Sequence, residues 1–581
     1  MGWGQNRRPK GDGFVASLLK TVAVKAVPGP GRPVGSWIAP AMGLLCAAGC
    51  GDAGRDGPWF EDEAAERGID FLHVSGYRDR FLLPEIVGSG AALADLDGDG
   101  DLDAYLVQSG SLYLDSPPFS DWLYWNDGHG NFEASSAPLP AREGYGMGVA
   151  TGDYDNDGDV DLYVTTVGPN ALLRNDGNGR FTEIAQSAGV DDPGFGASAA
   201  FLDLDRDGHL DLFLANYIHW SEAAEIDCYI AGNLTYCPPQ NYNAPAPDRI
   251  FRNNGDGTFT DVSGEAGLNL AFGNGFGVVG ADYNGDGLTD VYVANDMMVN
   301  QLWINRGDLR FADSAMAMGT AVDGYGTAKA GMGVAAADVD DDGDVDLLVV
   351  NLEGQTDSLF LNRGEWFDDA TAEFGLAVTS RRHTRFGVAL ADFDNDGILD
   401  LYQANGRVSS TEERLGDVFA EPNLLYRGTA DGKFEETTTY GGVVPSLVHT
   451  SRGLAVGDVD DDGGLDLLVV NRDGAAYLLM NRVAGRGNWV RFRALDRHGR
   501  DSHAATVSGV VLGRRQYRDV QPASSYLSAN SPQVHFGLGE GTEITGVAVR
   551  WPDGALEEFG DFQAGRAVVL RQGAGRRTAS D

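Results

Sequence analysis

The chain has 581 residues, of which 22% are charged, and its formal net charge is −43. This acidity argues against nucleic acids and anionic membrane surfaces as partners, because both would repel the protein. Hydrophobic residues make up 43% of the chain, which is enough to build a core and argues against a disordered protein.

Residues 1–50 have the features of an export signal. The start is basic, and the apolar stretch at 34–49 is too short to span a bilayer. It ends in Ala47-Ala48-Gly49-Cys50, which resembles a bacterial lipobox, in which Cys50 would be lipidated. An ordinary cleaved signal peptide or a misassigned start codon is the alternative. We therefore expect an extracytoplasmic protein, which is secreted, periplasmic or lipid-anchored at the cell envelope, with a linker at 51–58.

A nine-residue acidic loop recurs seven times, and its clearest copy is Asp95–Asp103, with the sequence DLDGDGDLD. Aspartates at positions one, three and five converge on one point, and the glycine at position six permits the tight turn. Such a turn suits a hard cation with about six to eight oxygen ligands, so we predict up to seven Ca²⁺ ions as cofactors. The alternative is a set of solvated Asp/Gly turns.

The predicted ligands are the side chains at positions one, three, five and nine and the backbone carbonyl at position seven. By loop they are Asp95, Asp97, Asp99, Asp101 and Asp103; Asp153, Asp155, Asp157, Asp159 and Asp161; Asp203, Asp205, Asp207, His209 and Asp211; Asp282, Asn284, Asp286, Leu288 and Asp290; Asp338, Asp340, Asp342, Asp344 and Asp346; Asp392, Asp394, Asp396, Ile398 and Asp400; Asp458, Asp460, Asp462, Gly464 and Asp466. Position twelve never carries the bidentate glutamate of an EF-hand, so each loop is expected to lead into a strand.

The loops begin between 50 and 79 residues apart, a period typical of β-propellers. Small residues precede each loop, a hydrophobic strand follows it, and a third and a fourth strand flank an Asn/Gly turn. We therefore predict an all-β chain with a seven-bladed propeller over 59–485. The seventh unit lacks a fourth strand, and residues 59–68 match that pattern, so we expect them to close the ring.

An insertion in the third unit contains Cys228 and Cys237, which are nine residues apart. A local disulfide is expected in an exported protein, and two unrelated thiols are the alternative. After residue 485 the acidic loops stop, and short alternating strands predict a second, small β domain at 486–573. The polar tail at 574–581 is expected to be disordered.

The acidic loops and their flanking strands resemble FG-GAP/VCBS repeats, the blades of integrin-alpha-type propellers. Residues 524–530 (SSYLSAN), 534–539 (VHFGLG) and 549–554 (VRWPDG) resemble the ASPIC/UnbV domain. Together with residues 68–90 and the cysteine insertion, they resemble the bacterial relatives of cartilage acidic protein. The resemblance implies a calcium-stabilised propeller outside the cytoplasm and no single established reaction. The segment 502–507 (SHAATV) departs from the glycine-rich turn usual in the domain.

The sequence contains no nucleophile elbow, HExxH zinc motif or phosphate loop, so we assign no catalytic or organic-cofactor-binding residues. We predict a monomeric, non-enzymatic binding or adhesion module for a protein or glycan ligand. One alternative is an enzyme of natural-product biosynthesis that uses the funnel of the propeller. The other is a glycan-binding lectin, whose contact patch would comprise Tyr217, Trp220, Tyr229, Tyr236 and Tyr242.

Overall fold

The computed structural model describes residues 57–578, apart from 79, 114–118, 410–416 and 438. The chain divides into two units, 1–51 and 52–581, and all described residues belong to the second. The predicted export signal, the lipidation site at Cys50 and residues 51–56 of the linker lie outside the described residues.

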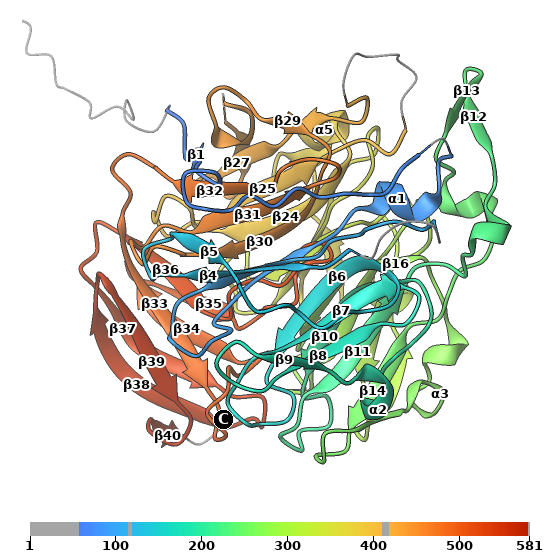
Figure 1. Ribbon diagram of the computed structural model, residues 1–581. Helices are drawn as coiled ribbons and strands as arrows, with labels where there is room; N and C mark the ends of the chain where they lie inside the picture. Colours follow the sequence, from blue (N-terminus) through green and yellow to red (C-terminus); the bar gives the residue numbers. More distant parts are fainter. Residues whose placement is uncertain (1–56, 79, 114–118, 410–416, 438, 579–581) are drawn as a thin grey trace, which may run out of the picture. The chain divides into compact units, whose positions relative to one another are not determined.

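Seven four-stranded antiparallel sheets dominate the fold, and each contains one acidic loop between its first two strands (Figure 1). In ring order they are β2 (Ala91–Ala94), β3 (Asp103–Leu106), β4 (Trp122–Asn126), β5 (Phe132–Ala134); β6 (Tyr145–Gly152), β7 (Asp161–Val167), β8 (Ala171–Asn175), β9 (Phe181–Glu183); β10 (Gly196–Leu202), β11 (Asp211–Asn216), β14 (Arg249–Asn253), β15 (Phe259–Asp261); β16 (Gly275–Ala281), β17 (Asp290–Asn295), β18 (Gln301–Asn305), β19 (Phe311–Asp313); β20 (Val334–Ala337), β21 (Asp346–Val349), β22 (Ser358–Asn362), β23 (Phe367–Asp369); β24 (Arg385–Ala391), β25 (Asp400–Asn405), β27 (Leu424–Gly428), β28 (Phe434–Glu436); and β30 (Ser451–Gly457), β31 (Asp466–Asn471), β32 (Tyr477–Asn481), β1 (Phe60–Asp62). The prediction of an all-β propeller is confirmed.

The sheets form a closed ring. Their first strands contact one another in chain order from β2 to β30, and β30 contacts β2. The last sheet takes its fourth strand from the start of the described chain, with Phe60 opposite Asn481 in the pairing of β1 with β32. The Phe60 ring is buried and meets the rings of Phe393 and Tyr402 edge to face. This closure leaves no open edge between the first and last sheets.

The first strands are rich in small residues because they lie side by side around the axis. A Cβ atom on Gly148 would lie 2.8 Å from the Ala197 carbonyl oxygen, and one on Gly277 would lie 2.6 Å from that of Met332. Both contacts are too close for a side chain, so glycine sets how tightly neighbouring sheets approach.

Short helices, one small hairpin and one further pair of short strands lie outside the seven sheets. The helices α2, α3 and α4 each follow a fourth strand and end at a glycine in the left-handed conformation, which is the usual C-terminal signal. The remaining elements are α1 (Leu83–Val87), α2 (Ala185–Ala188), α3 (Ser263–Ala266), α4 (Ala315–Met318), α5 (Leu376–Thr379), the 3-10 turns η1 (Glu222–Ala224), η2 (Pro239–Asn241), η3 (Leu268–Leu270), η4 (Ser380–Arg382) and η5 (Tyr440–Gly442), the hairpin of β12 (Cys228–Ile230) and β13 (Asn233–Thr235), and the pair β26 (Glu421–Pro422) and β29 (Val448–His449).

The C-terminal domain consists of two sheets around their own core, which includes Phe492 and Trp551. One sheet has the order β36 (Val534–Gly539), β33 (Asn488–Leu495), β39 (Arg566–Arg571), and the other has the order β35 (Arg514–Asp519), β34 (Thr506–Val511), β37 (Glu543–Arg550), β38 (Leu556–Gln563), β40 (Arg576–Thr578). The predicted disorder of the tail is wrong at β40. This strand pairs with β38 and brings Arg577 opposite Glu557, so backbone pairing and charge order it.

Residues 524–530 of the C-terminal domain enter the centre of the ring. Ser525 pairs with Val334 on β20, and Ala529 pairs with Ala92 on β2, three sheets further around the ring. Tyr526 at the tip is fully buried, and its hydroxyl donates a hydrogen bond of 3.2 Å to the Val87 carbonyl. This segment, which we call the plug, occupies the centre of the ring, where the enzymatic alternative placed a substrate.

Candidate metal centres in the acidic loops

The aspartate at position nine organises each loop. In the first loop, Asp103 accepts hydrogen bonds from the backbone N–H of Leu96 (2.9 Å) and of Asn126 (3.0 Å). One oxygen therefore closes the loop, and the other holds the end of the third strand. The same two contacts recur at Asp161, Asp211, Asp290, Asp346, Asp400 and Asp466.

The aspartate at position one ties the sharp turn. In the second loop, Asp153 accepts a hydrogen bond of 3.0 Å from the N–H of Gly158, and in the sixth Asp392 accepts one of 2.8 Å from Gly397. The N–H at position seven donates to the carboxylate at position five in every loop, for example His209 to Asp207 at 2.8 Å. The carboxylates are therefore held in place by the backbone of their own loop.

The predicted ligand oxygens converge. In at least five loops, three aspartates each present a carboxylate oxygen within 4.8 Å of the others. These sets are Asp95, Asp97 and Asp99; Asp153, Asp155 and Asp161; Asp203, Asp205 and Asp207; Asp338, Asp340 and Asp346; and Asp392, Asp394 and Asp400. In two of these loops the converging carboxylates come from positions one, three and five. In the other three they come from positions one, three and nine.

Several carboxylate oxygens of the seven loops are buried and lack a hydrogen-bond donor. Among the described residues, no donor reaches Oδ1 of Asp155, Asp203, Asp282, Asp458 or Asp460. A buried anionic oxygen without a partner is costly, and a cation at the centre of the loop would supply one. The predicted metal ligands are carboxylate oxygens and one amide oxygen, that of Asn284, and Ca²⁺ prefers oxygen ligands of this kind.

Burial also raises the pKa of several loop aspartates, which favours their protonated form in the absence of a metal ion. It raises the pKa of Asp103, Asp338 and Asp458 to about 7, and that of Asp290 and Asp346 to about 8. Neighbouring carboxylates of the same loop add to the effect at each of them. A bound divalent cation would favour the ionised form of these groups.

An asparagine at the end of the third strand, which the sequence predicts only as part of a turn, links neighbouring loops. Asn175 donates from Nδ2 to the carbonyl of Leu96 in the preceding loop (2.8 Å) and to that of Val160 in its own loop (3.1 Å). Its Oδ1 accepts the N–H of Gly177 in the hairpin turn at 3.1 Å. The same contacts to two loops are made by Asn126, Asn253, Asn305, Asn362 and Asn481.

The sixth sheet has Gly428 at this position. A Cβ atom there would lie 2.2 Å from the Leu399 carbonyl oxygen, so no side chain fits. The recurrence of asparagine before the Gly turns is the signal that the sequence offered for this link.

The C-terminal domain covers the loops with arginines. Arg491 lies 2.6 Å from Asp458, and Arg493 lies 3.2 Å from Asp95. At Asp203 burial raises the pKa to about 6, even though the charge of Arg500 acts in the opposite direction. The position-one carboxylates thus face the loop on one side and the C-terminal domain on the other.

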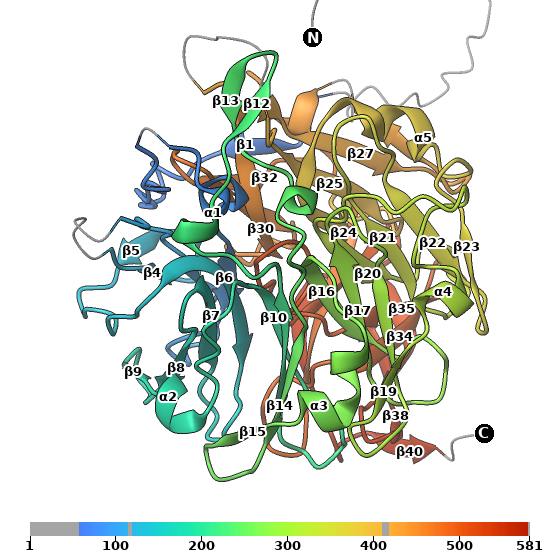
Figure 2. The same ribbon diagram turned by 90° about the vertical axis from the view of Figure 1, so that its right-hand side faces the viewer.

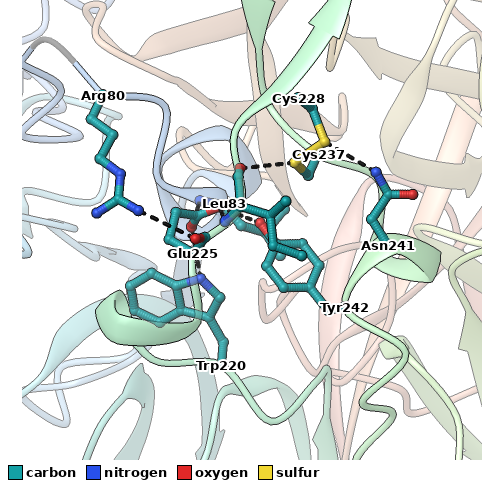
Figure 3. The surroundings of a disulfide bond; sticks show 9 residues. Arg80, Leu83, Trp220, Glu225, Cys228, Cys237, Asn241 and Tyr242 are labelled. Carbon is teal, nitrogen blue, oxygen red and sulfur yellow. Dashed lines mark hydrogen bonds between the residues drawn. A yellow bond between two sulfur atoms is a disulfide. The ribbon is translucent and has the colours of Figure 1, made fainter.

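The cysteine insertion is tied to the ring at a different place. Cys228 and Cys237 form a disulfide at the base of the β12–β13 hairpin (Figure 3). Glu225 beside it accepts hydrogen bonds from the N–H of Leu83 (2.9 Å) and from Nε1 of Trp220 (2.8 Å), while its carbonyl accepts one from Arg80. These contacts fix the insertion against α1.

The predicted glycan-contact patch is not an exposed surface. Tyr217 and Tyr236 are buried, Tyr242 is half-buried with its hydroxyl on Glu225, and Trp220 is half-buried. Of the five aromatic residues only Tyr229, which is 64% exposed, lies open to solvent. The other four are covered by the packing of the insertion onto the ring and do not form an exposed contact surface.

Within the described ranges, no helix has the length and apolar character that a membrane crossing requires.

Comparison with known proteins agrees with the repeats and with the C-terminal domain. An FG-GAP-like repeat model matches residues 95–164, 154–214, 227–293, 282–349 and 338–402, and an ASPIC and UnbV model matches residues 496–577. Cartilage acidic protein 1 of Homo sapiens is 28% identical over 504 residues, which cover 81% of this chain and 70% of the human protein. Its counterpart in Xenopus tropicalis is 28% identical over 515 residues, which cover 81% and 71%.

Two solved structures are also similar. A lectin from Agrocybe aegerita, described as recognising non-reducing terminal N-acetylglucosamine, has a TM-score of 0.35 and 17% identity, and the match covers 66% of this chain and 86% of the lectin. YCF48 bound to a D1 peptide has a TM-score of 0.38 and 10% identity, with 71% and 98% covered. On the repeat and domain matches, the chain belongs to the FG-GAP-like repeat proteins with a C-terminal ASPIC/UnbV domain and is homologous to cartilage acidic protein 1.

Proposed function

We propose that this protein is a non-enzymatic, extracytoplasmic binding module whose propeller is stabilised by Ca²⁺ in its acidic loops. The observation that carries the proposal is the set of buried carboxylate oxygens that converge in the loops without hydrogen-bond donors. The disulfide between Cys228 and Cys237 suits an oxidising compartment outside the cytoplasm.

Calcium would act on the fold through the strands that each loop joins. Positions one to five follow the first strand, and position nine begins the second strand while holding the end of the third. A cation bound to both parts of the loop would therefore fix three strands of one sheet. Because it binds the folded ring and not the unfolded chain, occupancy adds to stability by mass action.

The size of this effect can be anticipated. Extracellular calcium modules bind with dissociation constants of about 10⁻⁴ to 10⁻³ M, so about 10 mM calcium exceeds them roughly 10- to 100-fold. Each occupied site would then contribute about 1.4 to 2.7 kcal/mol to the free energy of unfolding.

The test combines metal counting with melting. We expect elemental analysis to find up to seven calcium ions per chain and a chelator to lower the melting temperature. Asp205→Ala, in the third loop, should remove one ion. Asp256→Ala is the matched control, because Asp256 is an exposed hairpin aspartate outside the loops. A protein with no bound calcium and the same melting temperature in chelator would refute the proposal.

The ligand surface is expected away from the loops. The arginines of the C-terminal domain contact position-one carboxylates of the loops, so part of the loop surface is already covered. We therefore assign calcium a structural role and look for the partner at the opposite end of the ring.

A further inference from the structure

A cavity of about 200 Å³ lies beyond the tip of the plug, at the ends of the strands that are remote from the acidic loops. Its walls are mainly apolar and aromatic and include Tyr217, Phe276, Met332 and Phe386. Residues of α1 and of the insertion complete the lining, and Figure 2 shows both at this end of β6, β10 and β16 (Figure 2). The rings of Tyr217 and Phe276 are stacked at 4.1 Å, which gives the cavity a rigid aromatic wall.

One carboxylate lines this cavity. Asp296 directly follows β17, and its backbone is held by Asn274, whose carbonyl accepts the Asp296 N–H at 2.9 Å and whose Nδ2 donates to the Asp296 carbonyl at 2.8 Å. The Tyr217 hydroxyl donates a hydrogen bond of 2.8 Å to Oδ2 of Asp296. Within the described part of the chain, Oδ1 has no hydrogen-bond partner, although Asp296 is only 4% exposed.

An orphan carboxylate oxygen of this kind is uncommon in a folded protein, because a buried anion without a partner destabilises the fold. Lysine, arginine and histidine are absent from the described residues that line the cavity. The walls therefore offer an anionic group and aromatic faces to a ligand but no positive charge. This combination favours a cation and disfavours a carboxylate or a phosphate.

We propose that this cavity binds a small organic ammonium ion, with its charged nitrogen beside the carboxylate of Asp296 and its hydrocarbon or aromatic body against Tyr217, Phe276 and Phe386. The volume sets the size of the ligand. A cavity of about 150 Å³ holds benzene, so about 200 Å³ takes one ring with a short aminoalkyl arm. The proposal adds a small-molecule site to the binding module and does not depend on metal in the loops.

The experiment compares two probes of the same shape, benzylamine and benzyl alcohol, by isothermal titration calorimetry on the calcium-loaded mature chain at pH 8. Burial raises the pKa of Asp296 to about 7, so at this pH the carboxylate is ionised. We expect benzylamine to bind at least about tenfold more tightly than the alcohol, because only the ammonium ion adds an ion pair to the hydrogen bond with the carboxylate.

Asp296→Asn keeps the shape of the side chain and removes its charge, so the preference for the amine should fall to less than about threefold. Asp248→Asn is the matched control. Asp248 is also buried with an unpartnered Oδ2, but it does not line the cavity, so this variant should keep the preference. Met332→Trp, which fills the cavity, should abolish binding of both probes. Equal affinity for the two probes, no binding of either by the wild-type protein, or a preference that survives Asp296→Asn would overturn the proposal.

Discussion

The asparagine that links neighbouring loops gives a sharp test of how the ring is held together. Asn175→Ala removes the donor to the carbonyls of Leu96 and Val160 and the acceptor of the Gly177 N–H. Asn175 is 1% exposed, so water cannot easily replace its side chain at the two carbonyls. The Gly177 N–H is only half-buried and can be hydrated.

Each buried group left without a partner costs about 1–3 kcal/mol. Two buried carbonyls would lose their hydrogen-bond donor, so we predict that Asn175→Ala lowers the free energy of unfolding by about 3 kcal/mol. Asn175→Asp should lose more, because a carboxylate would face the same two carbonyl oxygens. The measurement is urea unfolding in calcium, followed by tryptophan fluorescence.

The control for this experiment is Asn131→Ala. Asn131 lies in the corresponding hairpin of the first sheet, but it is exposed and its side chain bonds only to Asp127. We expect a change of less than about 0.5 kcal/mol. If Asn175→Ala were as mild as Asn131→Ala, the asparagine contacts between sheets would not stabilise the ring.

Three further outcomes are expected. Calcium binding at pH 6.5 should release protons, because burial raises the pKa of Asp290 and Asp346 to about 8, and calorimetric heats that do not depend on buffer ionisation would contradict this. The contribution of these two groups to stability without metal should be largest below their unfolded pKa of about 4 and should fall as pH rises to about 8, whereas calcium should flatten this contribution, as melting curves across pH can check. Deletion of residues 59–68 should lower stability far more than its length suggests, since it removes β1 and the buried Phe60 ring, and an unchanged melting temperature would rule out closure by this strand.

The repeated loops and the strands beside them could be predicted because their signals are local. Small residues, Asp/Gly turns and alternating apolar residues each specify the conformation of a few neighbouring residues. The disulfide between Cys228 and Cys237 is of the same kind, since both cysteines belong to one hairpin.

The repeat pattern also revealed the distant pairing of β1 with β32, but other features that depend on distant segments were missed. The plug has no strand pattern, and Ser525 and Ala529 pair with residues about 190 and 440 positions earlier in the chain. Burial of Tyr217 and Tyr236 depends on how the insertion packs on the ring, so their aromatic character alone wrongly predicted an exposed patch. Residues 576–578 form the strand β40 because they pair with β38, and the composition of the tail does not reveal this pairing.

The charge of the loops explains why the C-terminal domain lies where it does. In the fourth loop, Asp282, Asp286 and Asp290 carry one more negative charge than a calcium ion neutralises, and the positive charge of Arg550 acts on Asp282. The seventh loop is more acidic, and Arg491 of the C-terminal domain contacts both Asp458 and Asp461. Calcium ions in the loops, as proposed above, would therefore share this charge with the arginines, which contact the position-one carboxylates Asp95 and Asp458. Since each positive charge weakens the negative potential that attracts the other, metal loading of the ring and docking of the C-terminal domain should each reduce the electrostatic gain of the other.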